Sequence, residues 1–198
     1  MSGTNQSETK SVSHTNPPGD MPPWNYLLLD DDALLKQCDV NIYKSSGPGG
    51  QHRNKVSSAV RLYHRPTGIS AHGTSSRSQH ENKREALKNL RIKIATQARS
   101  DIDPDGQLPE VVESCLLSPK KKQSPATRRL EVGRKDKRFW PVAGYLLDLL
   151  EACKGRLQES ASHLGITTSN LASILKQDRH LHAAASQIRQ RYRLGPLK

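Results

Sequence analysis

Residues 59–72 have the sequence AVRLYHRPTGISAH, in which two alternating stretches flank a segment with Pro and Gly. In the first six residues, Val60 and Leu62 alternate with more polar neighbours, as in a strand that buries one face. Pro66 and Gly68 follow in a four-residue segment whose composition is typical of a tight turn, and the residues after Gly68 supply a second arm. The stretch therefore predicts a β-hairpin.

Further elements are predicted on both sides of this hairpin. Residues 40–44 alternate like a strand, and residues 24–36 predict a short helix. Downstream, Ser78 and Glu81 stand at the spacing of a capping box, and apolar residues recur at helical spacing to about Arg99. The expected unit is a short β-sheet with one long helix.

The last third of the chain predicts helices only. Pro141 suits the first turn of a helix, and residues 157–175 have the apolar spacing of a helix-turn-helix. Gly165 falls in the turn of that motif, and Thr167 can cap its second helix. The predicted fold class is α+β, a small sheet-and-helix domain followed by an all-α module that resembles a helix-turn-helix.

Charge is concentrated in two basic blocks. The chain carries a net charge of +12, of which residues 40–100 contribute +10 and residues 119–138 contribute +7, while the intervening residues 101–118 carry −5. A polyanion is the natural partner for such blocks, because phosphates that are neutralised release counterions and basic surfaces steer encounter. Nucleic acid is therefore the predicted partner class.

Composition excludes several other classes. A hydrophobic content of 33% predicts one or two small folded units rather than one large core. No apolar run is long enough for a membrane span, and the first twenty residues lack the pattern of a secretory signal, so the predicted location is the cytoplasm. Cys38, Cys115 and Cys153 lie far apart, which disfavours disulfides and a zinc site; we expect neither a metal nor a cofactor.

The segment SSGPGGQHRNK at residues 45–55 is the most distinctive loop. Gly49 and Gly50 allow backbone angles and close approaches that other residues do not. A flexible turn is the simple alternative, whereas a phosphate-binding loop lacks its Lys-Ser or Lys-Thr pair. A Ser-His-Asp triad is disfavoured, because only Glu81 and Glu85 are acidic in residues 40–100 and no G-x-S-x-G elbow occurs.

The motifs that follow this loop favour one interpretation of it. Residues 58–61 (SAVR), 66–69 (PTGI) and 77–83 (RSQHENK) come after residues 45–55 in a fixed order. This arrangement, from about residue 38 to residue 98, closely resembles the catalytic domain of class I peptide chain release factors.

The resemblance implies a compact α/β domain that enters the peptidyl-transferase centre of the large ribosomal subunit and hydrolyses the ester of peptidyl-tRNA. By the same resemblance, Gly49, Gly50 and Gln51 are the catalytic residues. The backbone N–H of Gln51 would donate to the developing negative charge, and its side-chain amide would orient water. The family's glutamine is commonly N5-methylated, so a glutamine methyltransferase is an implied partner at Gln51.

Basic residues around these motifs are the predicted contacts with ribosomal RNA. Those in the first block are Arg53, Lys55, Arg77, Lys83 and Arg84. Those in the second block are Lys120, Lys121, Lys122, Arg128 and Arg129. For any one of them, a solvated basic surface is the alternative.

These predictions divide the chain into four parts. We expect residues 1–23 to be disordered, residues 24–100 to form the catalytic domain, residues 101–138 to be a linker that is acidic and then basic, and residues 139–198 to form the helical module.

Decoding release factors carry further domains, and the residues before Val40 are too few and too polar for one that reads stop codons. The chain more closely resembles the short, codon-independent relatives that rescue stalled ribosomes as peptidyl-tRNA hydrolases. The expected activity is therefore codon-independent release of peptide from stalled ribosomes. Two alternatives remain. One is a nucleic-acid-binding regulator whose second helix, residues 168–177, would enter a groove; the other is a ribosome-binding protein without catalysis, which the intact Gly49-Gly50-Gln51 disfavours. The residues that the second helix would present are Ser169, Asn170, Ser173, Lys176 and Gln177.

Overall fold

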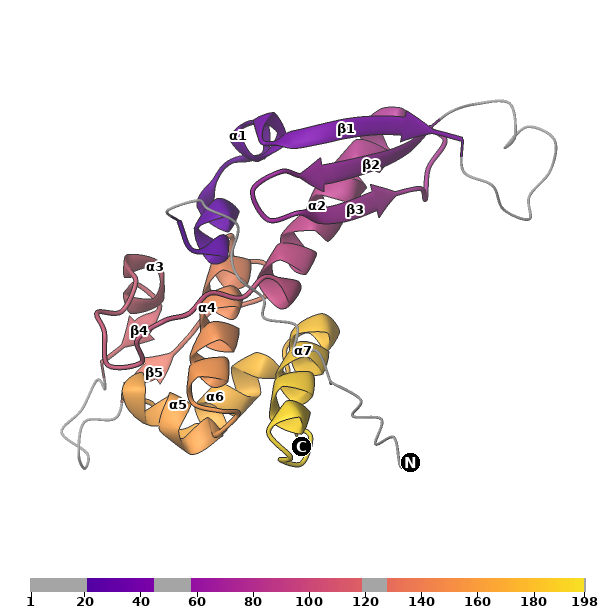
Figure 1. The fold of residues 1–198 in the computed structure, drawn as a ribbon. Coiled ribbons are helices and arrows are strands. Elements are labelled where there is room, and N and C mark those ends of the chain that lie inside the picture. Colours follow the sequence, from indigo (N-terminus) through magenta and orange to yellow (C-terminus); the bar gives the residue numbers. More distant parts are fainter. Residues whose placement is uncertain (1–20, 45–57, 119–127, 198) are drawn as a thin grey trace, which may run out of the picture.

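The computed structural model of the protein describes residues 21–44, 58–118 and 128–197. It contains a three-stranded antiparallel sheet in the order β1-β2-β3 at one end and a group of helices at the other (Figure 1). The strands of this sheet are β1 (Cys38–Tyr43), β2 (Ala59–His64) and β3 (Ile69–Gly73).

The predicted hairpin is confirmed as β2 and β3. His64 pairs with Ile69 at its closed end. Gly68 lies in the turn with a φ of +67°, and its N–H donates to the carbonyl of His64 at 2.9 Å. A positive φ is cheap only for glycine, which is why the turn needs this residue.

One long helix, α2 (Gln79–Gln97), covers one face of the sheet (Figure 1). Leu62 of β2 is fully buried against it, together with Leu90 and Ile94 of the helix itself. The opposite face is open, because Arg61 and Tyr63 of β2 and Asn41 of β1, which pairs with Arg61, are exposed. The sheet therefore buries one face only, as the alternation of β2 predicts.

The helical end is built around α4 (Phe139–Ala152). Residues 141–150 are all buried, because other elements pack around this helix (Figure 1). Pro141 lies in its first turn, as predicted. The other C-terminal helices are α5 (Leu157–His163), α6 (Thr168–Leu175) and α7 (Arg179–Arg191).

Shorter elements pack on both ends: α1 (Asp31–Lys36) contacts β1, α3 (Glu110–Glu113) contacts α4, and β5 (Arg129–Leu130) contacts α6. The helix predicted for residues 24–36 is in fact two elements, a 3-10 helix η1 followed by α1. Residues 101–138, the predicted linker, bury Val112, Cys115 and Leu130. The remaining short elements are η1 (Pro23–Leu28) and β4 (Leu116–Leu117).

The two ends of the molecule share one core. Trp24 of η1 meets Tyr145 of α4 edge to face, with ring centroids 5.8 Å apart. Arg99, just after α2, donates to the carboxylate of Asp148 in α4 at 2.8 Å, and both side chains are largely buried. Buried apolar side chains form one connected cluster from Trp24 to Leu197. The low hydrophobic content of the chain predicts one or two small units rather than one large core. That prediction uses an average over the whole chain, which does not show how strongly apolar residues are concentrated in α4.

The mixed helix-and-sheet class is thus confirmed. The division into domains and the helix-turn-helix character of the C-terminal helices stay predictions.

Candidate functional site

The predicted catalytic loop is carried between β1 and β2. Tyr43 pairs with Ala59 at this end of the two strands, so the chain leaves and re-enters the sheet at neighbouring positions. Gly49, Gly50 and Gln51 lie outside the described residues, as do Arg53 and Lys55. What the structure describes is therefore the base on which the loop is mounted.

Asn82 of α2 holds that base. Its side-chain N–H2 donates to the carbonyl of Ser58 at 2.7 Å and to that of Ser76 at 2.8 Å, and its side-chain oxygen accepts from the N–H of Ser76 at 2.9 Å. The side chain is buried, and a buried amide with these partners is costly to misplace. Ser58 directly follows the loop, so Asn82 fixes where the loop rejoins the sheet. Sequence reasoning missed this role, although Asn82 lies in one of the quoted motifs.

A turn between β3 and α2 forms the other side of the base. One carboxylate oxygen of Glu85 accepts from the N–H of Ser75 at 3.0 Å, from its hydroxyl at 2.8 Å and from the N–H of Thr74 at 2.9 Å. These hydrogen bonds lower the pKa of Glu85. The carboxylate is therefore committed to holding the turn.

The predicted cap of α2 is present in a modified form. The hydroxyl of Ser78 accepts from the N–H of Glu81 at 3.3 Å, as a capping residue should. The carboxylate of Glu81 accepts from the hydroxyl of Ser76 instead of the N–H of Ser78. The second half of the capping box thus helps to hold the turn rather than to close the helix.

Gly73 lets β3 run very close to α2. A Cβ built on this residue would lie 1.9 Å from the carbonyl oxygen of Asn82 and 2.9 Å from the backbone nitrogen of Ala86. Only glycine allows so close an approach of two backbones. The side chain of Asn82 reaches Ser58 and Ser76 across this narrow contact.

Three predicted RNA contacts lie beside the base. Arg77 is on the turn, and Lys83 and Arg84 are in the first turns of α2. Arg77 and Arg84 are exposed, and Lys83 is half-buried. Within the described parts of the chain, none of the three forms an ion pair. The arrangement keeps three positive charges close to the ends of the loop.

Two histidines of this region, His64 and His72, are held by neutral partners. His64 is fully buried, with Nδ1 2.8 Å from the hydroxyl of Thr67 and Nε2 3.1 Å from the side-chain oxygen of Gln37. Nδ1 of His72 lies 2.9 Å from the hydroxyl of Tyr43. Neither imidazole contacts a carboxylate among the described residues, so the geometry gives no support to a Ser-His-Asp triad.

Burial of His64 predicts a pH dependence of folding. Burial, with a smaller contribution from Arg65, lowers the pKa of His64 from 6.5 to about 4. The neutral form is therefore favoured in the folded protein. The stabilisation from this shift is present above pH 6.5 and lost as the pH falls towards 4, and it amounts to roughly 3 kcal/mol. NMR titration of the His64 ring should give a midpoint near 4, and a midpoint at or above 6.5 would contradict the prediction.

The second basic block is only partly available for RNA. Lys120, Lys121 and Lys122 lie outside the described residues. The guanidinium of Arg128 is 2.6 Å from a carboxylate oxygen of Glu113 and also donates to the carbonyl of Leu164 at 3.3 Å. Arg129 is exposed on β5. Arg128 therefore links α3 to the end of α5. The net charge of residues 119–138, from which the RNA contact is predicted, gives no information about this structural role.

The C-terminal helices α5 and α6 are joined by the turn that the sequence predicts. Gly165 has a φ of +64° there, and the hydroxyl of Thr167 accepts from the N–H of Asn170 at 3.1 Å. The side chain of Asn170, however, donates to the carbonyl of Leu130 at 3.0 Å and accepts from its N–H at 2.8 Å. One of the five residues expected to enter a groove is thus used to hold β5, and nothing supports the regulator alternative.

The described residues also bear on metal binding and on membrane insertion. No cluster of three or more His, Cys, Asp or Glu side chains there is suited to hold a metal ion. No helix in the same part of the chain is long and apolar enough to cross a membrane.

Comparison with known proteins identifies the domain that carries the loop. The family model described as RF-1 domain matches residues 33–136, just over half of the chain. Peptide chain release factor 2 of Buchnera aphidicola subsp. Baizongia pistaciae is 45% identical over 76 residues, which cover 36% of this chain and 21% of that protein.

Two proteins of Caulobacter vibrioides are similarly related. Its peptide chain release factor 2 is 47% identical over 75 residues, covering 36% of this chain and 20% of that protein. Its peptide chain release factor 1 is 43% identical over 76 residues, covering 37% and 21%. The chain thus spans about a fifth of the length of these relatives. With a match over more than half of its own residues, including the sheet, α2 and the loop between β1 and β2, this chain belongs to the RF-1 domain family.

Proposed function

We propose that this protein hydrolyses the ester of peptidyl-tRNA in the large ribosomal subunit and so releases the nascent peptide from stalled ribosomes without reading a codon. One observation carries the proposal. The Gly49-Gly50-Gln51 sequence of an RF-1 domain lies between β1 and β2, which pair at Tyr43 and Ala59, and the buried side chain of Asn82 holds Ser58 at the start of β2. A loop on so rigid a base can be placed accurately against a substrate.

The chemistry requires little beyond positioning. Ester hydrolysis needs a water molecule held in line with the carbonyl and a donor that faces the charge developing on its oxygen. In this proposal the backbone N–H of Gln51 is that donor, and its side-chain amide orients the water. Glu81 and Glu85 are engaged with the turn, so no general base from the described residues is assigned.

The cations beside the loop base are consistent with a binding site that is lined by RNA. Arg77, Lys83 and Arg84 would contact phosphates of ribosomal RNA as the domain enters the peptidyl-transferase centre. Arg53, Lys55, Arg129 and the three lysines at 120–122 would add contacts of the same kind. Gln51 is the residue on which a glutamine methyltransferase would act.

Codon independence is the part of the proposal that concerns the residues outside the matched region. The described residues outside it form η1 and helices α4 to α7, which pack together around α4. We assign to them a role in holding the protein on its target rather than in reading a codon.

Release assays on stalled ribosomes test both parts of the proposal. Ribosomes carrying labelled peptidyl-tRNA are programmed with truncated, sense or stop-codon mRNA, and release is measured in single turnover. We expect release on truncated mRNA without any need for a stop codon. Strict dependence on a stop codon would contradict codon independence.

Gly50→Ala is the matched variant for catalysis. An added Cβ at this position should misplace the donor at Gln51 while the basic surface remains unchanged. Peptide release should fall at least tenfold, about 1.4 kcal/mol of transition-state stabilisation, while ribosome binding survives. Release at the parental rate would show that this loop is not the catalytic element.

A further inference from the structure

A groove of about 810 Å³ lies between α2, the turn before α4 and the start of α7. It is separate from the loop base, since Asn82, Ser58 and Ser76 do not line it. The turn that borders it spans residues 133–138. The residues that line the groove are Lys88, Asn89, Ile92, Arg134, Lys135, Phe139, Trp140, Asp178, Arg179 and His180.

The groove is strongly cationic. Lys88, Arg134, Lys135 and Arg179 come from three different elements, and all four are exposed. Asp178 is the only acid among the described residues that line it. Its carboxylate is almost fully buried, accepts from the N–H of His180 at 2.8 Å and pairs with Arg134 at 3.3 Å. The groove therefore presents an excess of positive charge.

An aromatic ring stands among these charges. Trp140 is half-buried, and its ring packs edge to face on the buried ring of Phe139, with centroids 5.1 Å apart. Phe139 is 1% exposed and anchors the start of α4 in the core. Trp140 is thus a supported aromatic side chain with part of its surface open to the groove.

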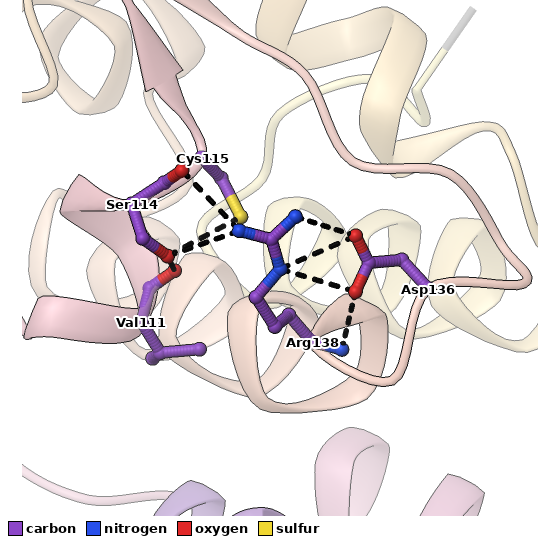
Figure 2. A network of polar contacts seen from close by, with 5 residues as sticks. All are labelled: Val111, Ser114, Cys115, Asp136 and Arg138. Carbon is purple, nitrogen blue, oxygen red and sulfur yellow. Dashed lines mark hydrogen bonds and ion pairs between the residues drawn. The ribbon is translucent and has the colours of Figure 1, made fainter.

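The turn that carries Arg134 and Lys135 is itself held in place. Figure 2 shows the guanidinium of Arg138 between the carboxylate of Asp136 and the backbone and hydroxyl oxygens of Ser114. Hydrogen bonds from Arg138 lower the pKa of Asp136 to about 2, so this pair stays ionised over the neutral range. The cations of the turn are therefore presented on a preorganised support, which reduces the entropy lost on binding.

We propose that this groove binds a single-stranded segment of RNA, with phosphates on the lysine and arginine side chains and a base stacked on Trp140. A positively charged groove with an aromatic platform is the arrangement by which proteins hold single-stranded nucleic acid. An acidic peptide would use the cations but has no planar base for Trp140. Binding as such is independent of the proposed function; only the identification of the segment as ribosomal RNA rests on it.

The test compares two triple variants of the full chain that lose the same charge. The groove variant is Lys88→Gln, Lys135→Gln and Arg179→Gln. The control variant is Lys36→Gln, Lys154→Gln and Arg193→Gln, three exposed cations outside the groove. Circular dichroism and thermal unfolding establish that both are folded. Binding of a labelled single-stranded RNA of about 12 nucleotides, within the usual site size, is followed by fluorescence anisotropy.

We expect the groove variant to raise the Kd at least tenfold and the control variant to raise it less than twofold. The slope of log Kd against log salt should decrease by about 2 for the groove variant, because three phosphate contacts are lost. Equal effects of the two variants would reduce the interaction to general charge attraction and overturn the proposal.

Trp140→Leu tests the stacking separately. It should raise the Kd for single-stranded RNA at least fivefold, whereas duplex RNA, whose bases are already stacked, should bind more weakly to the parent and respond little to the variant. No effect of Trp140→Leu, or equally effective competition by polyglutamate, would overturn the RNA assignment. Gly50→Ala should bind RNA like the parent, because Gly50 is not among the described residues that line the groove. If the parent protein bound RNA in the groove but released no peptide, that result would count against the proposed function alone.

Discussion

Replacing Gly73 with alanine should destabilise the protein by more than about 3 kcal/mol, beyond the usual cost of overpacking a core. The added Cβ would lie 1.9 Å from a backbone carbonyl oxygen of α2, and no flexible side chain can move aside there. The helix or the strand must shift, and Asn82 would then lose its place over Ser58 and Ser76. In a chain of this size we expect the Tm to fall by roughly 6–12 °C.

Gly133→Ala is the matched control for this change. Gly133 has no heavy atom within 4 Å of the added Cβ and is not among the glycines with a positive φ. The Gly133→Ala variant should be about as stable as the parent. At this position alanine introduces no clash in the folded protein and only lowers the conformational entropy of the unfolded chain. Thermal and urea unfolding of the two variants measure the difference. Equal stability of Gly73→Ala and the parent would disprove the close approach of β3 to α2.

Asp148→Ala should lower the stability of the protein about as much as Gly73→Ala does, but for an electrostatic reason. It would leave the guanidinium of Arg99 buried without its partner, which typically costs about 3–5 kcal/mol. Burial raises the pKa of Asp148, and Arg99 and the groups of Ser100 that bond to it counteract that rise. The ionised form of Asp148 is therefore favoured by the positive charge of Arg99, and that of Arg99 by the negative charge of Asp148.

The double variant Arg99→Met with Asp148→Leu separates this explanation from simple loss of packing. Removing both charges while keeping volume should restore most of the stability, because no ion is left uncompensated. Asp39→Ala, which breaks an exposed pair with Arg65, should cost no more than about 1 kcal/mol. The free energy of unfolding of the parent and of each of these variants is measured by urea unfolding. A cost for Asp148→Ala as small as that of Asp39→Ala would contradict a buried pair at this junction.

The parts of the fold that sequence could predict are those determined by neighbouring residues. The β2–β3 hairpin follows from alternation and from Gly68, and α2 follows from Ser78 and the apolar spacing behind it. Thr167 caps α6 as its position indicates. In each case the stabilising contacts join residues close together in the chain.

The parts that sequence could not predict depend on contacts between distant residues. The role of Asn82 depends on Ser58, 24 positions away, and the partner of Arg99 lies 49 positions away. Arg128 and Arg138 count as positive charge in any sum, yet each guanidinium contacts a carboxylate. The pattern of neighbouring residues in the sequence does not indicate which residue from a distant part of the chain contacts a given side chain. For that reason the groove beside Trp140 could not be inferred from sequence alone.

The edge-to-face contact of Trp24 with Tyr145 has a consequence for how this chain could have evolved. Trp24 precedes the sheet and Tyr145 follows it by far, so the helices after the RF-1 domain close around a residue that comes before its sheet. Without helices α4 to α7, the ring of Trp24, which is 8% exposed in this protein, would lose its cover. We therefore expect Trp24 and Tyr145 to be inherited together, and lineages that lack the helices to have lost the tryptophan as well.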